Sequence, residues 1–392
     1  MALSTIPDQL YSQETVEYVG FNKIKAAKLW KWWSEGPNDE CKREIDYCPP
    51  DKPEISFLEI IKGPLDVDDG NDVWVDDDTA WFSCMQYWGI ATELQDAIMD
   101  KRFKQLRRTR SCVQWILDTI ELRYESLEYF MATTPGREEG LYNDTFHPQS
   151  SAFDGAQSLI KLLRSSTHPG DSKRGGQSLP ETVDCATNFA PPGMIVLYKA
   201  TSMCTTRNLF GGPLLDAQGH FQNLQYLKAP LPNDFSGCKM MLCFTTSLQA
   251  AQTHASYLKR RGGSCHQPSI VRFCIPDIAV QNLHTQLAHC YFPGDDWRKL
   301  VWISRASQLY REPGRLSDLI LIIGHVASKP DKAFHDLESW EEITEDYVLK
   351  LGNDGREADV QYAFRGNDDG WEFLNTHATD IKVWSYPTRE YA

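Results

Sequence analysis

The sequence lacks an excess of positive charge. Its 392 residues carry 40 Lys and Arg against 54 Asp and Glu, a formal net charge of −14. Because binding to a phosphate backbone requires clustered Lys and Arg, this balance argues against a nucleic-acid partner. Two short basic clusters, at residues 101–110 and 259–261, are expected to be solvated faces of helices.

Long apolar runs and a targeting sequence are also missing. The longest apolar run, LILII at residues 319–323, is far shorter than the ~18–20 residues that cross a bilayer, and it suits a buried strand. The N-terminus has neither the basic nor the apolar region of a secretory signal. We therefore expect a cytoplasmic protein with no membrane partner.

Paired metal-binding cysteines and the common catalytic signatures are absent as well. None of the 11 Cys forms a CxxC pair, so free thiols are expected rather than a zinc site or a disulfide framework. The acidic segment at residues 66–78 places Gly70 in the wrong register for a calcium loop. The sequence contains no P-loop, G-x-S-x-G or H-E-x-x-H motif. A Cys–His dyad, such as Cys265 with His266 or His289 with Cys290, stays open, because such partners meet in space.

The sequence does contain two regions of different periodicity. Apolar residues at three- and four-residue steps predict helices at residues 17–35 and through 91–130, within a helical module at residues 1–165. A segment rich in Ser, Gly and Pro at residues 166–182 predicts a linker. A chain of 392 residues is also long for one core, which favours two domains.

Beyond the linker, short β-branched runs predict an α+β domain at residues 183–392. Ser247 is a candidate N-cap for a helix that continues to residue 259, and a second helix is expected at residues 370–378. The expected strands lie at residues 194–198, 240–244, 269–275, 320–326, 359–364 and 381–384.

Three segments of this C-terminal half carry short motifs. They are LYKATS at residues 197–202, DFSGCKMMLCFTTS at 234–247, and DDWRKLVWISR…DLILIIGHVASK at 295–329. Together they resemble the ADP-ribosyltransferase-like superfamily, and in particular a little-characterised family with the pattern YHGT…DFG-GFYLTT…W…NR…YDIIIGPVA. In that superfamily the first strand carries a Tyr followed by His or Arg, the second a Thr/Ser-rich motif that leads into a helix, and the third a carboxylate.

The resemblance implies NAD as the substrate and assigns most of a binding site. Matched onto this sequence, the first motif gives Tyr198, Lys199 and Thr201, and the second gives Phe244, Thr245 and Thr246. Lys199 stands where the family has His or other branches have Arg; its ammonium can donate to a ribose or phosphate but lacks their planar geometry. Trp297, Gly324 and His325 of the third segment are expected to serve the fold.

The third motif departs from the family. Gln361 occupies the place where transferases carry Glu, and its neutral amide cannot stabilise the oxocarbenium-like ribosyl cation that forms when nicotinamide leaves. We take Gln361 and Glu357 as the candidate catalytic residues. Asp359 and Glu372 are further acids that could substitute from neighbouring turns.

Two functions follow from these features. The first is an NAD-consuming ADP-ribosyltransferase or NAD glycohydrolase that acts on an unknown acceptor, for which a protein is one candidate. The second is a non-catalytic ADP-ribosyltransferase-like protein that binds a related nucleotide or a protein partner. The missing Glu favours the second function, whereas the second motif and Tyr198 favour the first.

Overall fold

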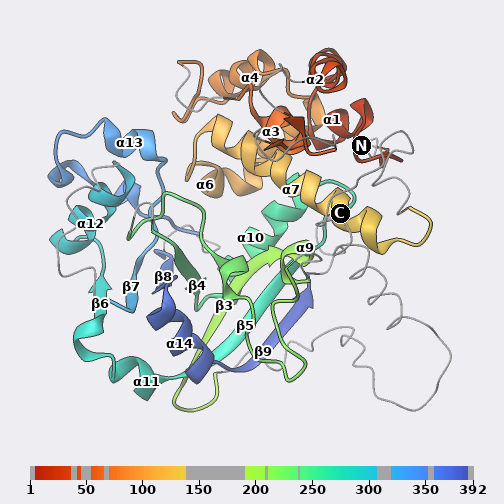
Figure 1. Ribbon diagram of the computed structural model, residues 1–392. Helices are drawn as coiled ribbons and strands as arrows, with labels where there is room; N and C mark the ends of the chain where they lie inside the picture. The colour runs from red at the N-terminus through yellow and green to blue at the C-terminus, as the bar shows by residue number, and fades with distance from the viewer. Residues whose placement is uncertain are drawn as a thin grey trace, which may run out of the picture.

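The chain combines a helical layer with a mixed β-sheet, an α+β architecture (Figure 1). The computed structural model describes residues 5–36, 42–45, 54–65, 70–137, 190–207, 211–236, 239–306, 319–351 and 357–386. The expected linker at residues 166–182 lies outside these ranges, so the division into domains stays a prediction. None of the described helices combines the length and the apolar character of a membrane span.

The N-terminal part forms the helical layer at the top of Figure 1. Its longest helix, α7, begins with a capping box in which Ser111 and Gln114 satisfy each other's main-chain N–H groups. A two-stranded ladder, β1 (Lys42–Arg43) with β2 (Glu54–Ile55), lies beside these helices. The helices are α1 (Gln13–Val19), α2 (Lys23–Glu35), α3 (Phe57–Lys62), α4 (Asp78–Tyr87), α5 (Thr92–Ile98), α6 (Lys104–Arg107) and α7 (Cys112–Thr133), with the 3-10 helix η1 (Lys101–Phe103) before α6.

The single helix expected at residues 17–35 is wrong: α1 ends and α2 begins within this range. Gly20 separates the two helices with φ of 132°, a conformation that favours glycine. A Cβ at this position would also overlap with the Leu94 side chain of α5. Tertiary packing at Gly20 therefore overrides the helical periodicity of the sequence.

The C-terminal part forms a seven-stranded sheet in the order β6-β7-β8-β4-β3-β5-β9. All pairs are antiparallel except β6 with β7. The six predicted strands are confirmed, whereas the short parallel edge strand β6 was not predicted. The strands are β3 (Met194–Ser202), β4 (Met241–Thr245), β5 (Pro268–Pro276), β6 (Leu287–Cys290), β7 (Leu321–His325), β8 (Val360–Arg365) and β9 (Thr379–Ser385).

Helices cover the sheet on several sides. Ser247 caps α10 as predicted, because its side chain accepts a hydrogen bond from the Ala250 N–H at 3.1 Å. The predicted helix at residues 370–378 corresponds to α14. Bounds are α9 (Met203–Thr206), α10 (Leu248–Arg261), α11 (Asp277–Gln281), α12 (Asp295–Arg305), α13 (Asp331–His335) and α14 (Asp368–His377), with the 3-10 helices η4 (Leu224–Leu227), η5 (His284–Gln286), η7 (Trp340–Glu342) and η8 (Glu345–Tyr347).

The segment at residues 295–329 contributes to the fold, as expected. Trp297 is fully buried in the cluster between α12 and the sheet, and its indole N–H donates to the His325 carbonyl at 2.8 Å. The His325 ring in turn accepts a hydrogen bond from the Phe292 N–H at 3.2 Å. A Cβ on Gly324 would overlap with the Cys290 carbonyl, so β6 and β7 approach closely only because this position is glycine.

The helical layer and α10 share one core. Tyr257 of α10 is 2% exposed within the hydrophobic cluster of the helical layer and donates to the Ile98 carbonyl at 3.2 Å. Arg123 of α7 is buried, donates to the Arg261 carbonyl at 2.6 Å and pairs with Glu93 at 2.9 Å. The helical layer is therefore fixed against the helix that follows the second motif.

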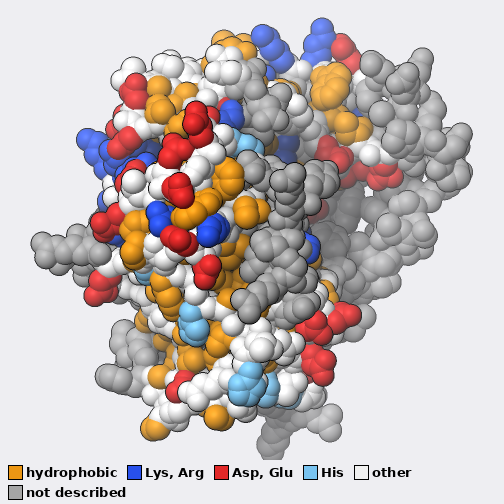
Figure 2. Space-filling model, turned by 90° about the vertical axis from the view of Figure 1, so that its left-hand side faces the viewer, with side chains coloured by type: hydrophobic (Ala, Val, Ile, Leu, Met, Phe, Trp, Pro, Cys, Tyr) orange, Lys and Arg blue, Asp and Glu red, His pale blue; other side chains and the backbone are white. Residues whose placement is uncertain are grey.

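The edge of the sheet formed by β6 lies on the left-hand side of Figure 1. Figure 2 shows the molecule from the left-hand side of Figure 1. On this face hydrophobic side chains lie among acidic and basic ones. Tyr291, which follows the edge strand β6, is 38% exposed and lies 5.1 Å from the His325 ring, centroid to centroid.

Candidate functional site

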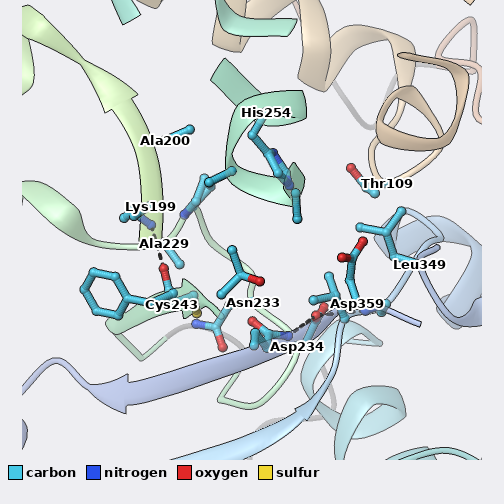
Figure 3. Close-up of a pocket in the computed structure, with 18 of the residues that line it drawn as sticks. Thr109, Lys199, Ala200, Ala229, Asn233, Asp234, Cys243, His254, Leu349 and Asp359 are labelled. Carbon is cyan, nitrogen blue, oxygen red and sulfur yellow. Dashed lines mark hydrogen bonds between the residues drawn. The ribbon is translucent and has the colours of Figure 1, made fainter. Parts of the chain in front are cut away.

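A cavity of about 330 Å³ lies between the helical layer and the sheet. Its lower walls come from β3, β4 and β8 and its upper walls from α10 and the start of α7 (Figure 3). We call this cavity the cleft. Its volume lies at the lower end of the ~300–1,000 Å³ range of ligand sites.

The cleft opens where the sheet divides. β3 and β5 pair at nine positions from Met194 to Ser202, but β3 and β4 pair only at Tyr198 and Thr245. Thr245 is in turn paired with Gln361 of β8. Because side chains directly opposite each other share a face, Tyr198, Thr245 and Gln361 form one row across three strands.

Lys199 bridges the division between β3 and β4. Its ammonium donates to the Cys243 main-chain carbonyl at 3.1 Å and lies 5.8 Å from the Phe244 ring centroid. Burial lowers the pKa of Lys199 from 10.5. Among the described residues no carboxylate forms an ion pair with it, so the ammonium adds positive charge to the cleft.

Asp234, at the floor of the cleft, joins the second motif segment to the segment at residues 295–329 and to Gln361 of β8. It is 5% exposed and accepts from the Arg305 guanidinium at 2.6 and 2.8 Å, from the Ala327 N–H at 3.0 Å and from the Gln361 amide at 2.6 Å. Arg305 also donates to Asp331 at 2.8 Å. The Gln361 amide therefore donates to the Asp234 carboxylate, whose charge Arg305 balances. Figure 3 labels Asp234 at the floor of the cleft.

Five of the eight residues predicted for the site line the cleft: Tyr198, Lys199, Phe244, Thr245 and Gln361. Phe244 is 2% exposed and packs edge-on against Phe273, 4.9 Å between centroids, so it supports the wall. The other three, Thr201, Thr246 and Glu357, are not among the lining residues. Thr201 is buried opposite Ser269, whereas Thr246 and Glu357 are exposed outside the cleft.

Asp359, immediately before β8, is a carboxyl group that lines the cleft. It precedes Gln361 by two positions, and residues two apart on a strand share a face. The Leu351 N–H donates to its side chain, while Oδ2 is buried and has no hydrogen-bond partner within the described residues. Burial raises the pKa of Asp359 from 3.8 to about 6. It is therefore mostly ionised at pH 7 and incompletely satisfied.

The upper wall contains charged residues whose role the sequence did not indicate. Arg110, before α7, and Arg261, at the end of α10, both donate to Asp118, at 2.9 and 2.7 Å. Both guanidinium groups stack on Trp115, at 5.2 and 4.5 Å from its centroid. The expectation that the two basic clusters are solvated helix faces is thus wrong for Arg110 and Arg261, which share Asp118 although Arg261 is 143 residues from it in sequence.

His254 of α10 projects into the cleft between the sides that carry Lys199 and Asp359 (Figure 3). His254 is exposed to solvent along the open wall of the cleft. The protein around it and the positive charges of Lys199, Arg261 and Arg110 lower the pKa of His254 from 6.5 to about 4. His254 is consequently neutral at pH 7.

A second cavity of about 680 Å³ adjoins the cleft, since Asp118 and Leu258 line both. Its wall from α7 carries the acidic residues Glu121, Glu125 and Glu128. The two cavities together provide room for a ligand longer than the cleft itself.

The Cys–His alternative at Cys265 and His266 lies outside the cleft. His266 is fully buried, and its Nδ1 lies 3.0 Å from the Ser126 hydroxyl and 3.3 Å from the Ser202 hydroxyl, so it is tied to the fold. Within the described ranges, His, Cys, Asp and Glu side chains nowhere form a group of three that could hold a metal ion.

Comparison of the chain with protein-family models, with curated proteins and with solved structures finds no match. The class of the site is therefore inferred from its own geometry.

Proposed function

We propose that the cleft binds NAD or a related nucleotide and that the protein cleaves the bond between nicotinamide and ribose, as an ADP-ribosyltransferase-like enzyme. The observation that carries the proposal is the row of Tyr198, Thr245 and Gln361 on adjacent strands at one cavity. These residues were assigned from three motifs far apart in the sequence. Their convergence, and the contacts of Asp234 with Arg305 and Gln361, agree with motifs that belong to one site.

The chemistry requires a negative charge beside the ribose, and Asp359 can supply it. When the C1′–N bond breaks, its electron pair leaves with neutral nicotinamide, and C1′ becomes a ribosyl cation. An ionised Asp359, already short of hydrogen-bond partners at Oδ2, would stabilise that cation in a site of low polarity. Water or an acceptor hydroxyl then bonds to C1′ and releases its proton.

Gln361 takes a different part in this scheme. Its amide is engaged with Asp234 and cannot stabilise a cation, so we assign it to shaping the floor. Glu357 is exposed outside the cleft, which leaves no catalytic part for it.

A second candidate is a protein that binds the nucleotide without cleaving it. The fixed, neutral amide of Gln361 at the place of the family's Glu is the observation that favours this reading. Binding of NAD without release of nicotinamide would support it.

The test is nicotinamide release from NAD by the wild-type protein and by matched variants. We expect release above background, and Asp359→Asn should lower the rate by roughly 10²–10³ while NAD binding persists. Glu357→Gln, in the same turn but outside the cleft, should leave the rate unchanged. If wild type binds NAD but releases no nicotinamide with water or any candidate protein acceptor, the enzymatic proposal fails and the binding function remains.

A further inference from the structure

We propose that the upper wall of the cleft, which carries Arg110, Arg261 and His254 in the same cavity as Lys199, binds the phosphate groups of the ligand. The helical layer would thereby supply part of the ligand site rather than a separate function. The proposal that this phosphate belongs to a dinucleotide rests on the proposed function. The phosphate chemistry itself stands on the charges and contacts of this wall.

The first argument is charge. Arg110, Lys199 and Arg261 line the same cavity, and within the described ranges Asp118 is the carboxylate that pairs with two of them. Although burial raises the pKa of Asp118, Arg261 and Arg110 outweigh this effect and hold it below 3.8, so Asp118 stays ionised. The wall therefore retains positive charge, and a diphosphate, which has about two negative charges, complements it.

The second argument is that a buried hydrogen-bond donor in this wall lacks an acceptor. Arg261 is 2% exposed, yet its Nε–H has no hydrogen-bond partner among the described residues. Its stacking on Trp115 and Tyr257, both at 4.5 Å, fixes the charge in place without satisfying that donor. Leaving one buried N–H of this guanidinium without an acceptor, although Asp118 pairs with its charge, is costly unless an anion completes the site.

The third argument comes from the opposite wall. Asp359 stands across the cleft, and Asp234 at the floor is already engaged by Arg305. An anion is thus favoured near His254 and disfavoured near Asp359. This polarity would orient a dinucleotide with its phosphates under the helical layer and its nicotinamide ribose toward β8.

The experiment titrates inorganic pyrophosphate, ADP-ribose and adenosine into the full-length protein by calorimetry. Pyrophosphate and ADP-ribose should bind with affinities that fall as salt increases, and adenosine should bind at least tenfold more weakly than ADP-ribose. Arg110→Gln should weaken both phosphate ligands by about tenfold or more. Arg108→Gln is the matched control, because Arg108 belongs to the same basic segment but does not line the cleft.

A measurement on the unaltered protein guards against loss of folding in the variants. The pKa of His254, followed by NMR, should rise when pyrophosphate binds, because the anion offsets the charges of Lys199, Arg261 and Arg110. No pyrophosphate binding, or an unchanged His254 pKa at saturation, would overturn the inference. So would NAD binding that Arg110→Gln and salt leave unaltered, although the proposed function would then survive. If pyrophosphate binds but nicotinamide nucleotides do not, the phosphate site stands and the proposed function fails.

Discussion

Asp359, just before β8, and Gln361 of β8 both line the cleft but lie in different electrostatic surroundings. Asp359 has one buried, unpartnered oxygen, whereas the Gln361 amide is held by Asp234. An acid whose ionised form is poorly stabilised by its own protein is common at functional sites, where a ligand completes the contacts. The sequence pointed to Gln361 as the motif residue, while the structure favours Asp359 as the group with available charge.

Burying the ionised Asp359 carboxylate with an unpartnered oxygen destabilises the protein. Replacing Asp359 by a neutral residue should therefore increase stability, and the gain should depend on pH. Because its pKa rises from 3.8 to about 6 on folding, the stability it contributes is present below pH 4 and is lost as pH rises through 6. Asp359→Asn should therefore be about 1–3 kcal/mol more stable than wild type at pH 8 and nearly equal at pH 4. Urea unfolding at the two pH values measures this, and equal effects at both would contradict it.

Gln361→Glu would introduce the carboxylate that the family carries at this position. We expect it to lower the free energy of unfolding. Gln361 is 8% exposed and donates to Asp234, so a Glu would place a second carboxyl group against the first. The pKa of the new Glu should rise, and its contribution to stability should be present at low pH and lost as pH increases. We expect a loss of roughly 1–3 kcal/mol at pH 8 and a smaller one at pH 5. A variant as stable as wild type at both pH values would show that the amide contact is dispensable.

Among the elements, α10 does the most to build the cleft. It begins after the second motif, places His254 in the cavity and ends at Arg261, which is held by Asp118 of α7. Its N-cap, Ser247, was predicted from sequence because capping depends on local spacing. The pairing of Arg261 with Asp118 was not, because no local signal couples two positions 143 residues apart.

The N-cap of α10 can be tested without touching the ligand site. Ser247→Ala removes the acceptor for the Ala250 N–H and should lower the free energy of unfolding by about 0.5–2 kcal/mol. Ser247→Asp should retain most of it, because Asp is also a favoured N-cap. Thermal unfolding of the three proteins measures the difference, and an equal loss in both variants would mean that the cap does not act through this hydrogen bond.

The same distinction between local and distant signals applies to the strands. The six longer strands were predicted because apolar or aromatic residues follow one another at successive or alternate positions in each. β6 escaped because LAHC has only four residues and no alternation, and it becomes a strand by pairing with β7. Likewise the motifs predicted five of the residues that line the cleft, Tyr198, Lys199, Phe244, Thr245 and Gln361, whereas the position of its upper wall depended on packing of the helical layer.

In the whole molecule, Arg123 links the helical layer to α10. Its guanidinium pairs with Glu93 and donates to the Tyr18 and Arg261 carbonyls, all while 1% exposed. Arg123→Met keeps much of the volume but leaves both carbonyls without this donor. We expect the free energy of unfolding to fall by about 2–5 kcal/mol, with a single transition shared by the helical and the sheet signals.

Arg102→Met, which removes a guanidinium that is 52% exposed, is the control and should change the free energy of unfolding by less than about 1 kcal/mol. Two separate transitions would show that the layers unfold independently.

The most direct test of the account is whether NAD binds in the cleft. An NMR titration of the histidine ring signals at constant pH reports this by position, because His254 lines the cleft and the exposed His220 does not. We predict that the His254 signal shifts and saturates as NAD is added, while the His220 signal stays in place. A His254 signal that ignores NAD, or one that shifts no more than that of His220, would contradict the assignment of the cleft as an NAD site.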